Sequence, residues 1–453
     1  MTDATAPAPA APAAGGKRRS LLEVDERTRR RNAAEARFRL YGIVAISVGL
    51  LFLLLLLGSI LFNGLSAFQQ TFVQVPVYLD PERLDPEGNR DPEEMRGVTT
   101  FGYKPLLNEA VYEKVQSLGI ETPLPEPAMA PLLSDGAATT VRSFVLENPD
   151  RLGETVEFDL LASSRVDGYF KGRVTRDSIA RDRFIDAAHL DLADAMNEAG
   201  TMGKQFNLSF ITGTDASDNR PEQAGMGVSM IGSFFMMLVV LILALPIGVA
   251  ASIYLEEFAP QNRITDFIEV NISNLAAVPS IVFGILGLAV FIQFMHLPQS
   301  APLVGGLVLT LMTLPTIIIS TRASLKAVPP SIRDAALGVG ASKMQSVFHH
   351  VLPLAMPGIL TGTIIGLAQA LGETAPLLLI GMVGFIASNY PDGVAAGFLD
   401  PNSAMPAQIY EWAKRADPAF YERAWGGIIV LLAFLMTMNI IAIILRRRFE
   451  RRW

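Results

Sequence analysis

The chain has 453 residues, of which 50% are hydrophobic and 18% are charged, a balance that favours a membrane protein over a large soluble enzyme. The absence of cysteine excludes disulfides and cysteine-ligated metals, and the four histidines form no His-x-x-x-His zinc pair. The net charge of -7 is uneven, because basic residues gather at both ends and acidic residues between about 80 and 200.

The N-terminal segment is predicted to be basic and to lie outside the membrane. Residues 1–16 are rich in Ala and Pro, a composition typical of disorder, and the Arg-rich residues 17–39 are interpreted as a solvated or lipid-facing helix. We therefore assign 1–40 as a cytoplasmic N-terminus, disordered at its start and basic after it. A nucleic-acid partner is not predicted, since positive flanks are ordinary beside a membrane anchor.

Six apolar stretches are long enough to cross the membrane, which takes about 20 helical residues. They are 41–62, 226–255, 272–294, 301–321, 356–382 and 425–445. The first could instead be a cleaved signal peptide. However, its apolar core is long and no Ala-x-Ala site follows it. We therefore expect an uncleaved first transmembrane helix over 41–63.

Lys and Arg near the helix ends predict the orientation. The N-terminal flank, the tail 447–453 and the loop between the fourth and fifth spans are all basic; the loop carries Arg322, Lys326, Arg333 and Lys343. Six crossings place these three segments on one side. The expected protein is therefore multi-pass, with both termini cytoplasmic.

Residues 69–224 are predicted to form a large extracytoplasmic insertion. Apolar and polar residues alternate over 156–160 and 206–210, as in half-buried strands. Residues 178–199 have the pattern of an amphipathic helix closed by Gly200. The acidic residues lack the alternation and turn glycine of a calcium loop, so no metal site is predicted. We expect a small α+β domain or cap.

The cytoplasmic loop 321–354 is predicted to be a helix-turn-helix. A Pro-Pro-Ser run suits a helix start, and Gly338 and Gly340 permit a sharp reversal. A second helix over 342–351 is expected to stop before Pro353. Its apolar face suits docking into a groove of another protein and consists of Met344, Val347, Phe348 and Val351.

Within this loop, an acid, two alanines, a glycine and a Leu-Pro pair occur at a characteristic spacing: Asp334, Ala335, Ala336, Gly340, Leu352 and Pro353. The set resembles the Glu-Ala-Ala-x-x-x-Gly motif and following Ile-x-Leu-Pro of ABC importer permeases. Asp334 keeps the carboxylate of the family's Glu, whereas His350 stands at the Ile position. The resemblance implies a coupling helix that seats in the cleft of a cytoplasmic ATPase. The alternative is an amphipathic loop packed on its own bundle.

The chain lacks a Gly-x-x-x-x-Gly-Lys-Ser/Thr phosphate loop. A separate partner subunit is therefore expected to bind ATP and Mg²⁺ and to hydrolyse the ATP. We expect no cofactor on this chain and no enzymatic activity of its own.

The fifth span carries a stripe of small residues that lets helices approach closely: Gly358, Gly362 and Gly366. Gln369 and Glu373 lie one turn apart beside it. An acid at mid-membrane costs about 2.5–3.5 kcal/mol on insertion scales, so Glu373 should face protein or water. Gln369, Glu373 and Thr374 are candidates for the translocation path; alternatively, Glu373 is a structural acid satisfied by Thr374 or a neighbouring helix. Pro376 is expected to kink the span.

The run Gly372-Glu373-Thr374-Ala375-Pro376 is similar to the signature of phosphate importer permeases of the PstA type, and the resemblance covers about 205–446. It implies an all-α polytopic membrane protein with six transmembrane helices, five of them in a permease domain over 225–446. The α+β insertion then follows the first helix. The family's usual Arg is replaced here by Gln369, so the intrahelical Arg–Glu pair is absent.

The resemblance also implies a phosphate importer of the bacterial inner membrane that works by alternating access. The implied partners are a second permease (PstC type), an ATPase dimer (PstB type), a periplasmic phosphate-binding protein (PstS type) and membrane lipid. An ionised Glu373 would repel phosphate and is not expected to be its ligand. The open alternatives are the same machine for sulfate, molybdate or an organic solute, an intramembrane hydrolase and an ion-driven secondary transporter.

Overall fold

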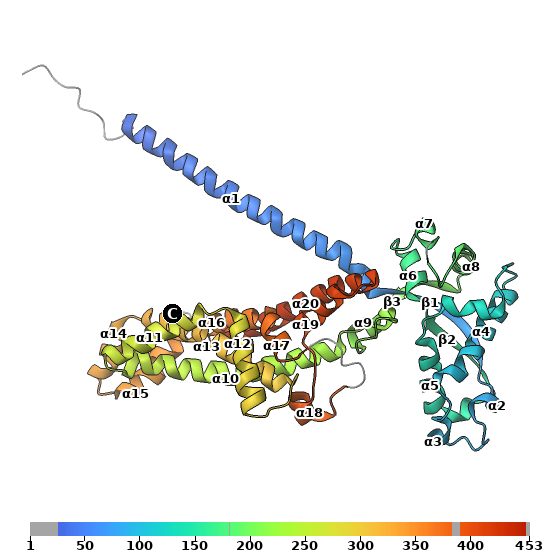
Figure 1. Ribbon diagram of the computed structural model, residues 1–453. Coiled ribbons are helices and arrows are strands. Elements are labelled where there is room, and N and C mark those ends of the chain that lie inside the picture. The colour runs from blue at the N-terminus through green and yellow to red at the C-terminus, as the bar shows by residue number, and fades with distance from the viewer. Residues whose placement is uncertain (1–25, 181, 383–389, 450–453) are drawn as a thin grey trace, which may run out of the picture. The chain divides into compact units, whose positions relative to one another are not determined.

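The computed structural model describes residues 26–180, 182–382 and 390–449 (Figure 1). The chain divides into two compact units, 1–59 and 60–453. The disorder predicted for residues 1–16 falls outside the described residues, as does the end of the predicted tail 447–453.

The predicted first span and its basic flank form one continuous helix, α1 (Glu26–Gly64). Its charged first half continues into the apolar run, whose large side chains are exposed, as suits a surface that meets lipid. The sequence gives this helix no internal Pro to interrupt it.

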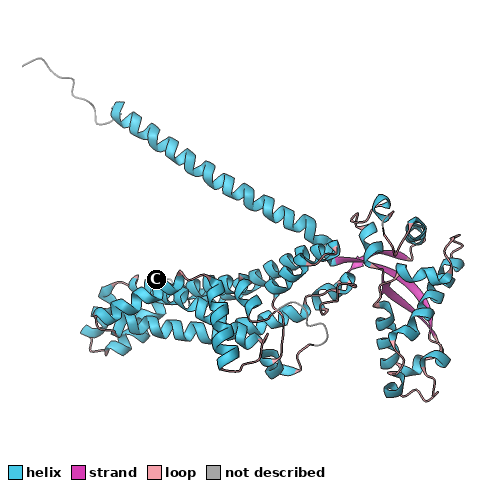
Figure 2. Cartoon of the chain, in the orientation of Figure 1, coloured by secondary structure: helices cyan, strands magenta, loops and turns pink. Residues whose placement is uncertain are grey.

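The segment after α1 contains a three-stranded antiparallel sheet in the order β2-β1-β3 (magenta in Figure 2). Its strands are β1 (Gln69–Tyr78), β2 (Thr155–Leu161) and β3 (Met202–Phe206). Alternate residues of the central strand are fully buried, namely Val73, Val75 and Val77. They form one core with α4 (Thr100–Ser117) and α5 (Ala137–Glu147). The shorter helices are α2 (Pro81–Leu84), α3 (Pro92–Met95), α6 (Ser164–Phe170), α7 (Arg176–Ile179), α8 (Ala187–Glu198) and α9 (Leu208–Thr212).

Local capping explains where this segment departs from the sequence predictions. A strand forms over 156–160 as predicted, but the strand predicted over 206–210 is wrong, because Asn207 accepts a hydrogen bond from the Phe210 N–H and starts α9. The single helix predicted over 178–199 is two helices, since Asp186 forms a capping box with His189 and begins α8. The C-terminal end at Gly200 is as predicted, with φ of +75°.

The permease segment is a helical bundle. Its long helices are α10 (Gly227–Ile253), α13 (Pro302–Lys326), α16 (Leu352–Gly372) and α20 (Pro418–Phe449). Shorter helices are α11 (Arg263–Ala276), α12 (Ser280–Gly287), α14 (Pro330–Gly338), α15 (Lys343–Ser346), α17 (Ala375–Leu379), α18 (Gly393–Leu399) and α19 (Met405–Lys414). In the described part of the chain, five helices are long and apolar enough to cross a membrane, or up to six if a bent pair counts as one span.

The bent pair corrects the third predicted span, 272–294. The chain there turns by 99° between α11 and the helix that starts at Ser280. Pro279 explains the break, because proline disfavours helix in the residue before it and starts a new helix readily.

The fifth predicted span, 356–382, is also not one helix. The helix ends at Gly372, Glu373 has extended backbone (φ −80°, ψ 128°), and α17 begins two residues later. Pro376 lies in the first turn of α17, where its missing N–H costs nothing. It therefore starts a helix, and the predicted kink within a helix is wrong.

Candidate coupling site

The loop 321–354, predicted to be cytoplasmic, turns sharply between α14 and α15. Helix α14 starts at the predicted Pro-Pro-Ser run, and Gly340 adopts φ of +92°, a conformation that residues with a Cβ rarely enter. The Gly340 N–H donates to the Leu337 carbonyl and the Ala341 N–H to the Ala336 carbonyl, each at 3.0 Å. These bonds satisfy the C-terminal carbonyls of α14 and fix the turn.

The helix after the turn does not stop before Pro353, contrary to the prediction. Helix α15 passes through a π turn (Val347–Val351) directly into α16, so that Lys343–Gly372 is a single helical segment. The wider π turn accommodates Pro353, whose ring and missing N–H would interrupt an ordinary α-helix. Leu352 and Pro353 are half-buried in the first turn of α16. The turn at Gly340 is thus mechanically continuous with the fifth span.

A buried ion pair anchors α14 to the C-terminal end of α10. Arg333 donates to Glu257 from Nη2 at 2.6 Å and from Nε at 3.1 Å. Its guanidinium also donates to the carbonyls of Val328 and Leu325, at 2.8 and 2.9 Å. Glu257 lies in the π turn Tyr254–Phe258 and is only 8% exposed. Bidentate Arg–carboxylate geometry of this kind fixes orientation as well as distance.

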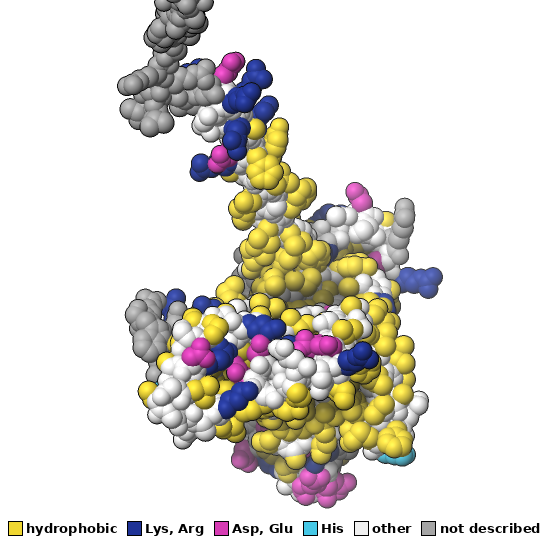
Figure 3. Space-filling model, turned by 90° about the vertical axis from the view of Figure 1, so that its left-hand side faces the viewer, with side chains coloured by type: hydrophobic (Ala, Val, Ile, Leu, Met, Phe, Trp, Pro, Cys, Tyr) yellow, Lys and Arg dark blue, Asp and Glu magenta, His cyan; other side chains and the backbone are white. Residues whose placement is uncertain are grey.

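A second charged cluster joins α10, α11 and α13. Glu256 lies 3.4 Å from Arg322 and 3.6 Å from Lys326, and Arg322 also reaches Glu269 of α11 at 2.5 Å. Figure 3 shows basic and acidic side chains side by side on the end of the bundle that carries α14 and α15. These cations predicted the orientation of the chain, but their pairing was not predicted, although Glu256 and Glu269 offered opposite charges in a neighbouring segment.

The surface at the turn carries exposed apolar side chains beside exposed Asp334 and Lys343. Val339 is 86% exposed, and Leu337 and Met344 are exposed beside it. Of the predicted apolar face, Met344 and Phe348 are exposed, whereas the remaining two, Val347 and Val351, are buried against the bundle. Asp334 and Ala335 are exposed and Ala336 is buried; the Asp334 carboxylate has no ion pair within the described residues.

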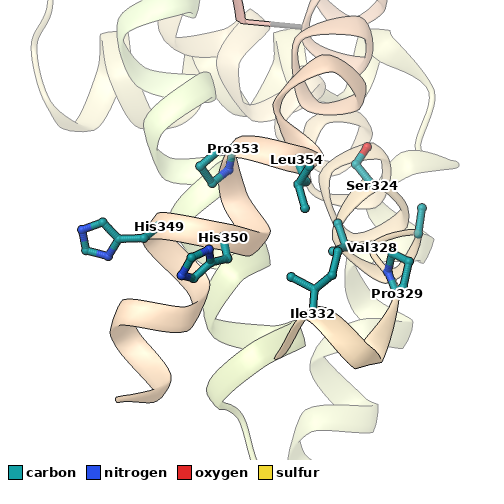
Figure 4. A pocket seen from close by; sticks show the side chains of 9 residues that line it. Ser324, Val328, Pro329, Ile332, His349, His350, Pro353 and Leu354 are labelled. Atoms are coloured by element: carbon teal, nitrogen blue, oxygen red, sulfur yellow. The ribbon is translucent and has the colours of Figure 1, made fainter. Parts of the chain in front are cut away.

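A pocket of about 600 Å³ lies behind the turn (Figure 4). Val328, Ile332 and Leu354 give it apolar walls. His349 and His350 are adjacent in sequence, but their rings point in different directions and do not converge on one ligand (Figure 4). Nowhere in the described chain do three metal-ligating side chains gather.

The structure separates the three path candidates. Gln369 is exposed on α16, whereas Glu373 and Thr374 are half-buried at the break before α17. The Glu373 carboxylate has no hydrogen bond or ion pair with a described residue. Helix α17 packs closely on α12: a Cβ at Gly284 would lie 2.7 Å from the Pro376 Cα.

The small-residue stripe of α16 faces α13. Side chains at Gly358 and Gly362 would overlap Ser324 and Ser320, and one at Gly366 would lie 3.4 Å from Ile317. The glycines therefore permit a close helix–helix approach between the helices on either side of the coupling loop.

Comparison with known proteins connects this geometry to a family. The family described as "Binding-protein-dependent transport system inner membrane component" matches residues 244–453, and a "Domain of unknown function (DUF3333)" matches 25–180. "Phosphate transport system permease protein PstA 1" of Mycobacterium tuberculosis (strain ATCC 25618 / H37Rv) is 32% identical over 230 residues, or 50% of this chain and 71% of that protein.

One further relative and one solved structure are also similar to part of this chain. "Probable ABC transporter permease protein YqgI" of Bacillus subtilis (strain 168) is 29% identical over 248 residues, covering 52% of this chain and 82% of that one. The structure of the inward-facing MetNI methionine ABC transporter covers 50% of this chain and 98% of its own, at 16% identity and a TM-score of 0.38. On the 32% identity across more than two thirds of a relative, the chain belongs to the PstA-type phosphate transport system permease family.

Proposed function

We propose that this chain is the permease subunit of an ATP-driven importer of inorganic phosphate. The observation that carries the proposal is the 230-residue match to phosphate permeases, which takes up half of this chain. The family match over 244–453 includes the turn at Gly340 and the helix that continues from it.

The coupling turn suits the transmission of motion from a separate ATPase. Val339 and Met344 present an apolar contact surface, and Asp334 supplies a carboxylate at its edge. A displacement of this surface is transmitted to α16 through the continuous helix and to α10 through the Arg333–Glu257 ion pair. Alternating access then follows from the two helices changing their angle around the path.

The proposed assembly contains a second permease of the PstC type, two ATPase subunits of the PstB type and a periplasmic phosphate-binding protein of the PstS type. Because this sequence has no phosphate loop, we assign the binding and hydrolysis of ATP, with Mg²⁺, to the ATPase subunits. We place the chain in the bacterial inner membrane with six spans, the bent pair α11–α12 being one of them. Both termini are cytoplasmic by their basic residues.

We also propose that Glu373 and Thr374 border the translocation path. The support is the broken backbone between α16 and α17 and the half-buried Glu373 carboxylate, which has no ion pair in the part of the chain that the structure describes. Irregular backbone at membrane depth is tolerated where it is covered by protein or lines a water-filled cavity. A basic residue of the partner permease would pair with Glu373, replacing the Arg that this chain lacks at Gln369.

Uptake of radiolabelled phosphate tests the proposal. Cells that lack their own phosphate permease, supplied with this chain and its partners, should accumulate phosphate, and excess sulfate should not compete. Uptake that sulfate blocks and phosphate does not would move the substrate to the sulfate class. Uptake that continues after removal of the ATPase would favour an ion-driven secondary transporter.

A further inference from the structure

Buried charges fix the extracytoplasmic segment to the start of α20. Glu422 pairs with Lys171 and Arg173, each at 2.7 Å, and Asp167 pairs with the same two cations at 2.8 and 3.0 Å. Both carboxylates and the Lys171 side chain are at most 6% exposed. Arg423, also buried, donates to the carbonyls of Ala67 and Glu222. Through Arg423, the residues of this cluster adjoin the backbone of Glu222.

A cavity of about 520 Å³ opens beside this cluster. Its acidic lining residues are Asp135, Asp218, Glu222 and Asp417, and its basic one is Arg165. Three of these five charges are already compensated, because Asp135 pairs with Lys104, Asp218 with Arg415 and Arg165 with Asp182. Glu222 and Asp417 have no ion pair within the described residues.

Glu222 is the residue that points to a ligand. It is 4% exposed; its Oε1 accepts a hydrogen bond from Ser134, but its buried Oε2 has no hydrogen-bond partner among the described residues. Arg423 donates to the backbone carbonyl of Glu222 and forms no ion pair with its carboxylate. Buried polar groups are almost always paired, so an unpartnered carboxylate oxygen on a cavity wall marks a place for a donor.

Apolar side chains line another part of the cavity, beside the polar Ser163, Ser164 and Asn219. Phe184 is 65% exposed, and Pro131, Leu133 and Ile185 line the cavity with it. The Arg165 guanidinium already lies over the Phe184 ring, 4.7 Å from its centroid. Carboxylates beside an aromatic ring and an aliphatic wall suit a cation on an alkyl stem. Phosphate would be repelled by the same carboxylates.

We propose that this cavity receives a lysine or arginine side chain of the extracytoplasmic solute-binding protein. The partner's identity rests on the proposed function, whereas the chemistry rests on the cavity. Residues 69–224 contain 27 Asp and Glu against 15 Lys and Arg, so their field attracts a basic protein surface. The two uncompensated carboxylates then fix the position of the docked partner.

The experiment compares two charge-removing variants with a matched control. The assembled transporter in lipid nanodiscs is titrated with the purified phosphate-binding protein, and the dissociation constant is measured for Glu222→Gln, Asp417→Asn and Glu198→Gln. The amide at 222 can still accept from Ser134, and that at 417 can still cap the Ala419 N–H. Glu198 is an exposed acid outside the cavity, and Glu198→Gln removes one negative charge, as each cavity variant does.

Each cavity variant should weaken docking about tenfold, and the control should leave it within twofold. Assembly by size exclusion and melting temperature are measured in parallel, and Asp417→Asn covers the case in which Glu222→Gln misfolds. A carbodiimide should also couple a lysine of the binding protein to Glu222 or Asp417 in the wild type. An unchanged dissociation constant in both cavity variants overturns the proposal. The proposal is also overturned if a carbodiimide couples free glycine ethyl ester to Glu222 or Asp417 and docking of the binding protein does not change. Failure of the proposed function is separate, because it would show as absent phosphate uptake by the wild type.

Discussion

Removal of the Arg333 side chain should uncouple the transporter while leaving it assembled. Arg333 supplies every hydrogen bond that the Glu257 carboxylate receives from the described residues, and it also satisfies two carbonyls at the end of α13. In Arg333→Ala, Glu257 stays buried without a counter-charge. Breaking a buried pair in this way costs about 3–5 kcal/mol. At about 1.4 kcal/mol per tenfold, the anchored position of α14 is disfavoured by a factor of roughly 100 or more.

The assay measures phosphate imported per ATP hydrolysed in proteoliposomes that contain the complete transporter. Arg333→Ala should hydrolyse ATP with little import, and its melting temperature should fall. Arg333→Lys keeps the charge but loses the planar fork, so its coupling should be intermediate. The double variant Arg333→Met with Glu257→Leu removes both charges. It should recover most of the stability, because an apolar pair of similar volume is often neutral.

The matched control is Arg263→Ala, which removes one exposed cation that has no ion pair within the described residues. This variant should keep the wild-type ratio of import to hydrolysis. If Arg333→Ala matched Arg263→Ala both in melting temperature and in phosphate imported per ATP hydrolysed, the Arg333–Glu257 pair would not contribute to coupling. That result would refute the reasoning.

Three further predictions concern separate residues. Gly340→Leu should keep assembly but lose phosphate uptake, because a side chain at φ +92° costs about 1–2 kcal/mol and reshapes the turn; normal uptake would contradict the coupling assignment. Glu373→Gln should lower uptake more than melting temperature, and unchanged uptake kinetics would reduce the residue to a structural role. Burial raises the pKa of Glu222, so the folded state binds the proton more tightly and the stability this confers falls as pH rises through the raised pKa. Glu222→Gln should remove that decrease, which melting curves between pH 4 and 8 would detect.

Local sequence patterns predict many helices of the bundle. An apolar stretch, and the Pro or Gly residues that begin or end a helix, can each be recognised within a short segment. The start of α14 and the reversal at Gly340 follow from Pro and Gly in this way. The 99° bend before Ser280 was missed, since an apolar run hides a change of direction. At Pro353 the breaker rule failed, because the π turn absorbs the missing hydrogen bond.

The candidate sites depend on partners far apart in sequence, and no local pattern predicts those. Arg333 and Glu257 are 76 residues apart, and Ser134 and Glu222 are 88 apart. Composition shows that residues 69–224 are rich in acids, but not which of these acids lack a cation. Only the fold separates Asp135, which has Lys104, from Glu222, which has no ion pair within the described residues.

The Arg333–Glu257 pair and the ion-pair cluster around Glu422 are linked through connected helices. Helix α16 continues from the coupling turn, and Arg446 of α20 donates to Thr361 of α16 at 3.1 Å. The same α20 carries Glu422, which is bound to Lys171 and Arg173 of the extracytoplasmic segment. A change of angle at α16 therefore acts on the segment that forms the acidic cavity. Coupling between two binding sites is reciprocal, so a partner that docks in that cavity must favour one nucleotide state of the ATPase as much as that state favours docking.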